Sequence, residues 1–310
     1  MREIWDEFEK ATNVMMHSVN GKQIALWGYG YSGWFVEHIL GIRGRKVDYR
    51  FDVDVPNKID CDPPTMIYEL NWDTCFMIIT LDASEDVLDR IERMGIFEGK
   101  NYLFAKKLYS LNNNAKLNYY TWLENWFDLD ISGIKSLEIL EKSNENAREY
   151  SSNIEYGLID ALNQFYIDSE DAIFDFGCGK GGALILADYA GFNKMGGIEF
   201  DRELYEIAIK NMKSIGMETS GILCGDAQLI EEELDQYNYF YFYNPFVGDT
   251  LLNVIHNIEK SFDRKNRKIT LIYRNPRCSV LIRDNSRFVL TRKIHTDSWV
   301  RDIYVYLLEA

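Results

Sequence analysis

The segment that most constrains the fold runs from Ala172 to Ala190, where a short apolar run leads into a cluster of glycines. Residues 172–176 read AIFDF, a run of strand length, and residues 177–182 read GCGKGG. The Ala- and Leu-rich stretch that follows, Gly182–Ala190, favours a helix. Glycines at a strand-to-helix turn let the backbone approach a ligand closely, and the first turn of the helix offers free N–H groups. The pattern predicts the first βα unit of a doubly wound α/β sheet.

The rest of the C-terminal half continues this alternation of strands and helices. We expect a helix over Glu203–Ile215 and strands at Met195–Phe200, Gly221–Cys224, Tyr239–Tyr243 and Lys268–Tyr273. Two last apolar runs, Phe288–Leu290 and Ile303–Leu308, have no helix between them. They predict a closing antiparallel pair.

An acidic residue stands where a nucleotide-binding unit needs one. Glu199 ends the second strand of the predicted sheet, 22 residues after Gly177. A carboxylate at the tip of this strand can accept hydrogen bonds from ribose hydroxyls. The glycine loop and the acid together therefore predict a nucleotide-like ligand.

Four motifs of this half, DFGCGKGG, GIEFD, CGDA and YNPF, resemble in their order and spacing those of the class I S-adenosylmethionine-dependent methyltransferases. The resemblance covers about 160 residues. It implies a seven-stranded sheet with S-adenosyl-L-methionine across the carboxyl ends of its strands. It also implies cofactor contacts by Gly177, Gly179 and Gly181 at the methionyl part, Glu199 at the ribose, Phe200, Asp226 and Ala227 at the adenine, and Asp175, Tyr150 and Ser152 at the amino-acid end.

The triplet Asn244-Pro245-Phe246 resembles the [N/D]-P-P-[Y/F] signature of amino-group methyltransferases, with one proline absent. By this resemblance the Asn244 oxygen would accept a hydrogen bond from a substrate N–H, and the Phe246 ring would pack on a planar group. The alternative is a plain turn that ends the fourth strand, since Asn-Pro pairs often mark turns.

The N-terminal half carries a second glycine loop. A strand-like run, Lys22–Trp27, precedes Gly28, Gly30 and Gly33, and Asp52 lies 24 residues after Gly28, with Asp54 as the alternative acid. This is the formal dinucleotide pattern. The segment IALWGYGYSG resembles the small Rossmann-like domains of bacterial sugar-modifying proteins. Ligand binding and a purely structural or dimerising role both stay open for this loop.

The chain is expected to divide into three parts. Residues 1–110 form a small parallel-sheet Rossmann-like domain, residues 111–148 an aromatic and polar helical connector, and residues 149–310 the methyltransferase domain. The connector's aromatic residues, Tyr119 to Phe127, could cover a substrate pocket or pack between domains or across a homodimer.

Composition narrows the partners. A formal net charge of −15 disfavours long nucleic acid, and five scattered cysteines indicate neither a disulfide framework nor a metal site. With no membrane-spanning or export segment expected, a cytoplasmic protein is predicted. The expected activity is methyl transfer to N or O of a small-molecule, carrier-linked or sugar-type acceptor. Methylation of a protein or nucleic-acid amine, and a nucleotide- or NAD-binding protein that uses Gly28–Gly33, are the alternatives.

Overall fold

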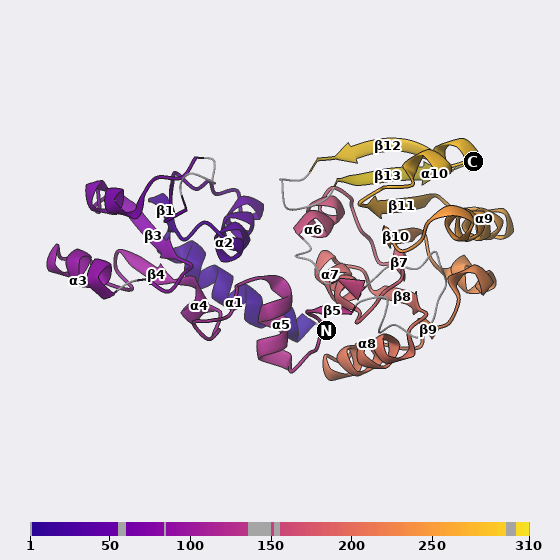
Figure 1. Ribbon diagram of the computed structural model, residues 1–310, viewed down its shortest axis with the longest axis horizontal. Helices are drawn as coiled ribbons and strands as arrows, with labels where there is room; N and C mark the ends of the chain where they lie inside the picture. The colour runs from indigo at the N-terminus through magenta and orange to yellow at the C-terminus, as the bar shows by residue number, and fades with distance from the viewer. Residues whose placement is uncertain are drawn as a thin grey trace. The chain divides into compact units, whose positions relative to one another are not determined.

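The structure, a computed structural model, describes residues 2–54, 60–83, 85–135, 150–151, 156–295 and 302–309. These residues form two compact units, Arg2–Trp126 and Phe127–Ala310, each with its own sheet (Figure 1). Ser152 lies outside the described residues, as do all residues of the segment 136–149, at whose end the methyltransferase domain was expected to begin. The predicted domain boundaries therefore stay a prediction.

The N-terminal unit contains a four-stranded parallel sheet in the order β2-β1-β3-β4. Its strands are β1 (Gln23–Trp27), β2 (Tyr49–Phe51), β3 (Cys75–Ile79) and β4 (Tyr102–Phe104). Its helices are α1 (Arg2–Ser18), α2 (Tyr31–Ile42), η2 (Pro64–Glu69), α3 (Glu85–Arg93), α4 (Ala105–Leu108) and α5 (Tyr119–Phe127). The buried strands β1 and β3 are almost wholly apolar, as parallel strands covered on both faces require. The small parallel sheet expected for this half is confirmed.

The aromatic residues of α5 belong to the core of this N-terminal unit. Trp122 is fully buried, and its ring lies 5.8 Å from that of Trp5 and 5.0 Å from that of Phe8, both on α1. Tyr119 packs against Phe8 and Phe35 at 5.6 and 5.0 Å. Aromatic pairs at such distances contribute about 0.5–1.5 kcal/mol beyond the area they bury. These rings therefore hold α1, α2 and α5 together, a role that differs from the pocket cover or domain contact considered from sequence.

The C-terminal unit contains a seven-stranded sheet in the order β12-β13-β11-β10-β7-β8-β9. Its strands are β7 (Ala172–Phe176), β8 (Lys194–Glu199), β9 (Ile222–Cys224), β10 (Tyr239–Tyr243), β11 (Ile269–Arg274), β12 (Val289–Ile294) and β13 (Ile303–Leu308). The first five strands along the chain alternate with the helices α7 (Gly182–Ala190), α8 (Arg202–Ser214), η3 (Ala227–Leu229), η4 (Glu232–Gln236) and α9 (Gly248–Arg264). Two further helices are α6 (Tyr156–Leu162), which precedes β7 in the chain, and α10 (Ser279–Asn285), which precedes β12. A separate two-stranded sheet pairs β5 (Ile134–Lys135) with β6 (Tyr150–Ser151).

The strand order shows how this sheet is derived. Counted from β7, it is the doubly wound order 3-2-1-4-5-6 with one additional strand, β13, inserted between the fifth and the sixth. β13 runs antiparallel to both β11 and β12, while the other strand pairs are parallel. The seven-stranded sheet and its antiparallel closing pair are confirmed.

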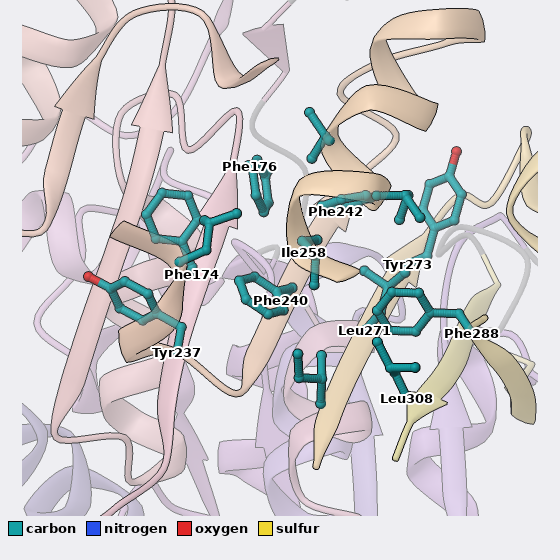
Figure 2. Packing of buried hydrophobic residues seen from close by; sticks show 14 of the residues in the cluster. Phe174, Phe176, Tyr237, Phe240, Phe242, Ile258, Leu271, Tyr273, Phe288 and Leu308 are labelled. Atoms are coloured by element: carbon teal, nitrogen blue, oxygen red, sulfur yellow. The ribbon is translucent and has the colours of Figure 1, made fainter. Parts of the chain in front are cut away.

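Alternate residues of the central strands build the larger core. Phe174 and Phe176 of β7 and Phe240 and Phe242 of β10 point to one face, where they meet Ile258 of α9 (Figure 2). All five side chains are fully buried. Burial of one such side chain contributes about 1.5–3 kcal/mol, so this face fixes α9 against the sheet. α6 and α7 lie on the opposite face (Figure 1).

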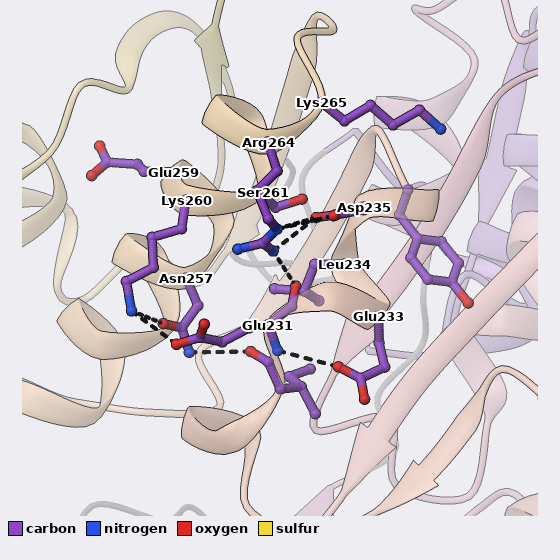
Figure 3. Close-up of polar contacts among 12 residues, drawn as sticks. Glu231, Glu233, Leu234, Asp235, Asn257, Glu259, Lys260, Ser261, Arg264 and Lys265 are labelled. Carbon is purple, nitrogen blue, oxygen red and sulfur yellow. Dashed lines mark hydrogen bonds and ion pairs between the residues drawn. The ribbon is translucent and has the colours of Figure 1, made fainter.

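Polar contacts tie α9 to the turns that precede β10. Lys260 pairs with Glu231 at 2.8 Å and Arg264 with Asp235 at 2.8 Å (Figure 3). Exposed ion pairs contribute only about 0–1 kcal/mol each. The buried Asn257 amide matters more, because it donates to the Ile230 carbonyl at 3.1 Å and leaves no buried N–H group unsatisfied there.

No described helix of the chain is both long and apolar enough to cross a bilayer.

Candidate functional site

The candidate site lies at the carboxyl edge of the large sheet. Gly177 follows β7, Glu199 ends β8, Asp226 follows β9 and Asn244 follows β10. These four strands are neighbours in the sheet and parallel to one another, so their carboxyl ends meet at one edge. Ligands of doubly wound folds bind at this edge, beside the point where the strand order reverses. Here that point lies between β7 and β10.

The glycine loop adopts a conformation that few other residues tolerate. Gly177, Gly179 and Gly181 have φ values of 76°, 52° and 86°. A side chain on Gly177 would also place its Cβ 3.0 Å from the Cβ of Pro245. The loop is anchored because the Gly177 N–H donates to the Ile198 carbonyl at 2.8 Å. The N-cap residue of α7 is Gly181, which has no side chain to cap the first turn, and free N–H groups at a helix start are the kind that bind a ligand carboxylate.

Glu199 connects the glycine loop to the start of α8. One of its carboxylate oxygens accepts the Gly179 N–H at 2.9 Å, and the other accepts the Asp201 N–H at 2.9 Å. Burial raises the pKa of this carboxyl above its ordinary value, and the two backbone donors partly offset that shift. Each carboxylate oxygen has two lone pairs, so each retains one for a further donor. The side chain is thus held in place with capacity left for two hydroxyl groups.

Asp175 is the second buried acid of the site and is 4% exposed. Burial, with the nearby Glu199 as the smaller cause, raises its pKa from 3.8 to about 8. Its main chain packs closely on β8, since a Cβ on Gly197 would lie 3.0 Å from the Asp175 carbonyl oxygen. A buried acid beside a second acid is favourably placed to receive a cationic group, because a cation would stabilise its ionised form.

The Asp175 shift predicts a pH-dependent stability. The folded protein holds a proton that the unfolded chain has released, so raising the pH from about 4 to about 8 favours the unfolded chain. Asp175→Asn resembles the protonated acid, and we expect it to raise the Tm clearly at pH 8 and little at pH 4. Thermal unfolding across this range measures both. Equal shifts at the two pH values would contradict the assignment, and Asp168→Asn, an exposed acid of the same unit, is the control.

The side chains after β8 and β9 form the other part of the site. Asp226 caps η3, its carboxylate accepting the Gln228 N–H at 2.9 Å, and Ala227 is buried beneath it. Phe200 is 38% exposed, which leaves its ring free to pack on a planar group. Gln228 in turn accepts a hydrogen bond from Asn253 of α9 at 2.8 Å. This loop is therefore tied to α9 as well as to its own strand.

Asn244 is a buried residue in the turn that follows β10. It has a φ of 46°, a left-handed conformation that costs most residues about 1 kcal/mol or more. Its side-chain oxygen accepts a hydrogen bond from the Tyr273 hydroxyl at 3.1 Å, and that hydroxyl accepts the Cys278 N–H at 3.3 Å. The Phe246 ring packs edge-on against Phe176 at 6.3 Å. Pro245 lies close to Gly177, so the Asn244-Pro245-Phe246 triplet adjoins the glycine loop.

Asn211 of α8 supports the glycine loop from behind. Its amide donates to the Lys180 carbonyl at 2.9 Å and to the Asp130 carbonyl at 2.8 Å, while its oxygen accepts the Asp130 N–H at 3.0 Å. Lys180 also pairs with the Asp130 carboxylate. Sequence reasoning missed Asn211, Gln228 and Tyr273. The one available signal was Asn211, a polar residue on the otherwise apolar face of an amphipathic helix.

Tyr150 and Ser152 were predicted to contact the amino-acid end of the cofactor, and neither side chain is among those that the structure describes. Tyr150 is in β6, where its backbone pairs with Lys135, and its side chain is not described. Ser152 lies outside the described residues. Their predicted contacts with the cofactor stay predictions. Within the described ranges no cluster of three or more metal-ligating side chains occurs.

The N-terminal glycine loop is constructed in a similar way. Gly28 has a φ of 99° and donates its N–H to the Phe51 carbonyl at 2.8 Å. Asp52, after β2, accepts the N–H groups of Tyr29 at 2.6 Å and Asp54 at 3.0 Å. A Cβ on Gly30 would meet nothing within 4 Å, whereas one on Gly33 would lie 2.3 Å from the Gly28 carbonyl oxygen. Asp52 thus fastens the loop, and ligand binding there stays a prediction.

Comparisons with known proteins give similarity at the level of solved structures. No model of a known protein family matches the sequence, and no curated protein resembles it. Among solved structures, a ribosomal protein L11 methylase from Lactobacillus delbrueckii subsp. bulgaricus is 13% identical, with a TM-score of 0.40 over 54% of this chain and 83% of that one. A putative RNA methyltransferase from Pyrococcus horikoshii is 14% identical, with a TM-score of 0.40 over 56% and 89%. A putative methyltransferase from Escherichia coli is 17% identical, with a TM-score of 0.38 over 50% and 85%.

At these identities and TM-scores the fold is assigned from the sheet itself. The evidence is the order of its seven strands, the single antiparallel strand β13 inside that order, and the glycine loop after the central strand β7. The unit Phe127–Ala310 therefore has the fold of the class I S-adenosylmethionine-dependent methyltransferases.

Proposed function

We propose that the chain is an S-adenosylmethionine-dependent methyltransferase that acts on a nitrogen or oxygen of a small-molecule or sugar-type acceptor. One observation carries the proposal. The glycine loop, Glu199, Asp226 and Asn244 follow four adjacent parallel strands and meet at one edge of the sheet. A donor site and an acceptor site are thereby neighbours, since Pro245 lies against Gly177.

The described residues fit the cofactor. Glu199 retains a lone pair on each oxygen for the two ribose hydroxyls, and Asp175 is a buried acid suited to a cationic ligand. The uncapped first turn of α7 suits the carboxylate. Phe200 and Ala227 offer apolar contact to the adenine ring. When bound, the cofactor would supply an electrophilic methyl group on a sulfonium.

The residues of this chain would then align the acceptor. The Asn244 oxygen accepts one hydrogen bond from Tyr273 and retains a lone pair for a substrate N–H or O–H. Methyl transfer requires in-line placement of the nucleophile above all, because the leaving thioether is neutral. A neutral amine offers its lone pair without a base and releases its proton to solvent after transfer, whereas a hydroxyl acceptor would require a base; we assign no base to any side chain.

Charge favours a small acceptor over a nucleic acid. The chain has 49 acidic and 34 basic residues, and a surface of this sign repels a phosphate backbone. Methylation of a protein amine is the second candidate, which the Asn244-Pro245-Phe246 triplet favours because it resembles an amino-group signature.

Calorimetry tests the cofactor first. We expect S-adenosylmethionine and S-adenosylhomocysteine each to bind the folded, cofactor-free chain at one site, and NADH not to compete with them. Absence of binding in a sample whose fold is verified by circular dichroism would contradict the proposal. Binding of NADH without binding of either methyl-donor ligand would favour a nucleotide-binding protein that uses Gly28–Gly33 instead.

A labelled donor tests the acceptor. Incubation of the chain with methyl-labelled S-adenosylmethionine and a cell extract, separated into small-molecule, protein and nucleic-acid fractions, is expected to label the small-molecule fraction. Label confined to protein or nucleic acid would overturn the choice of acceptor and leave the cofactor assignment intact. A Glu199→Gln chain, whose affinity for the donor we expect to fall at least a hundredfold, is the control for background transfer at a donor concentration well below its dissociation constant.

A further inference from the structure

A cavity of about 390 Å³ opens in the C-terminal unit at the edge of the sheet opposite to the glycine loop. Its lining includes Asn238 and Lys268, which precede β10 and β11, whereas Gly177 follows the carboxyl end of β7. Small-molecule pockets usually have volumes of about 300–1,000 Å³. The cavity is therefore large enough for a small molecule and lies apart from the proposed cofactor site.

The floor of the cavity is one face of the sheet. Tyr239, Thr270 and Leu307 are register partners across β10, β11 and β13, and Val305 follows two residues from Leu307 on the same face. Phe165, after α6, closes one side and packs edge-on against Tyr239 at 5.7 Å. The site thus has a rigid floor with an aromatic wall.

A β-bulge brings a cationic side chain to this face. Leu290 pairs with Tyr306 and Arg292 pairs with Val305, so Thr291 is an additional residue in β12. Directly paired residues point to the same face, which places Arg292 on the face of the cavity. Without the bulge Thr291 would pair with Val305, and Arg292 would point to the other face.

Two cations reach the cavity without a carboxylate partner. The Arg292 guanidinium donates to the Gln164 side-chain oxygen at 2.8 Å and lies 5.8 Å from the centre of the Phe165 ring. Within the described part of the chain neither Arg292 nor Lys268 forms an ion pair, whereas Lys260 and Arg264 of α9 both do. Both side chains are exposed, so a ligand can reach them from solvent.

The remaining polar groups of the lining leave a hydrogen-bond donor for an anion. The one carboxylate of the lining, Asp171, already accepts the Asn238 amide at 2.6 Å and the Asp168 N–H at 3.0 Å. Burial, with Asp171 and Asp168 as smaller causes, raises the pKa of Tyr239 to about 12. The Tyr239 hydroxyl is therefore protonated at neutral pH and can donate a hydrogen bond.

We propose that this cavity binds a small organic anion, a carboxylate or phosphate joined to an aromatic or short apolar body. The anionic head lies between Lys268 and Arg292, and the body packs against Phe165 and Val305. This second site does not depend on the proposed methyl transfer, because its lining includes no residue of the cofactor or acceptor site.

Calorimetry of the full chain at constant ionic strength tests the site with benzoate and phenyl phosphate. We expect at least one of the two to bind at one site, and their relative affinities identify the head group. Inorganic phosphate is expected to bind at least tenfold more weakly than phenyl phosphate, and benzyl alcohol not to bind. Arg292→Gln is expected to weaken the better probe at least tenfold, while the matched control Arg283→Gln, an exposed arginine of α10 paired with Asp284, leaves it unchanged.

The proposal would be overturned if neither aromatic probe bound, if Arg292→Gln and Arg283→Gln had equal effects, or if inorganic phosphate bound as tightly as phenyl phosphate. Titration of the same Arg292→Gln sample with S-adenosylhomocysteine separates the two sites, because its affinity for that ligand is expected to be unchanged. That result also verifies that the variant is folded.

Discussion

Glu199→Gln is expected to weaken binding of S-adenosylhomocysteine at least a hundredfold, or about 2.8 kcal/mol. The variant loses the negative charge of the carboxylate that would accept hydrogen bonds from the two ribose hydroxyls. In addition, the new amide group would face one of the two backbone N–H groups, of Gly179 or Asp201, that Glu199 now accepts. Two donors would then oppose each other, and a buried N–H would lose its acceptor. Calorimetric titration of the variant measures the loss.

Glu203→Gln is the matched control for this prediction. Glu203 lies four residues further along the chain, exposed in the first turn of α8. The substitution Glu203→Gln removes the same charge without changing a residue of the glycine loop. Its affinity for S-adenosylhomocysteine is expected to stay within a factor of two of that of the unchanged protein. If the two variants bound equally well, the assignment of Glu199 to the ribose would be wrong.

Gly33→Ala is expected to destabilise the N-terminal unit by about 2 kcal/mol or more. The new Cβ would lie 2.3 Å from the Gly28 carbonyl oxygen, closer than real Cβ atoms come, and both atoms belong to the backbone. The start of α2 would have to move away from the glycine loop. Overpacking of this kind costs about 1–3 kcal/mol, occasionally more, and lowers the Tm of a unit of this size by about 10 °C.

Tryptophan fluorescence measures the effect, because six of the seven tryptophans lie in Arg2–Trp126. Gly41→Ala is the control on the same helix. Gly41 has open space where its Cβ would be, and alanine favours a helix by about 0.5–1 kcal/mol over glycine. We expect this variant to unfold at the same or a slightly higher temperature. A destabilisation by Gly41→Ala equal to that by Gly33→Ala would show that close packing of α2 on the loop is not the cause.

The strands of both sheets could be predicted because their signals are local. Runs such as AIFDF and KITLIY are apolar, of strand length, and bounded by turns. The placement of Tyr119–Phe127 could not be predicted in this way. Its rings pack on Trp5 and Phe8, more than a hundred residues earlier, and no local pattern specifies so distant a partner.

The residues of the candidate site also fall into those with a local sequence signal and those without one. Residues proposed to face the cofactor, such as Gly177 and Glu199, belong to short motifs and could be predicted from the sequence. Residues that hold them, such as Asn211 and Tyr273, act through contacts between segments 29 or more positions apart. The cavity at the opposite edge depends on a bulge, and an additional residue in one strand has no signature until its partner strand is known.

The place of β13 within the sheet affects how this chain is made. β13 is the last of the seven strands to leave the ribosome, yet it lies between β11 and β12 and bonds to both. Until Ile303–Leu308 are synthesised, the growing chain carries β11 with an open edge, and such an edge can pair with the same strand of another chain. A premature stop before Ile303 would leave that edge bare permanently. Aggregation, more than loss of a binding site, would then be the fate of the truncated product.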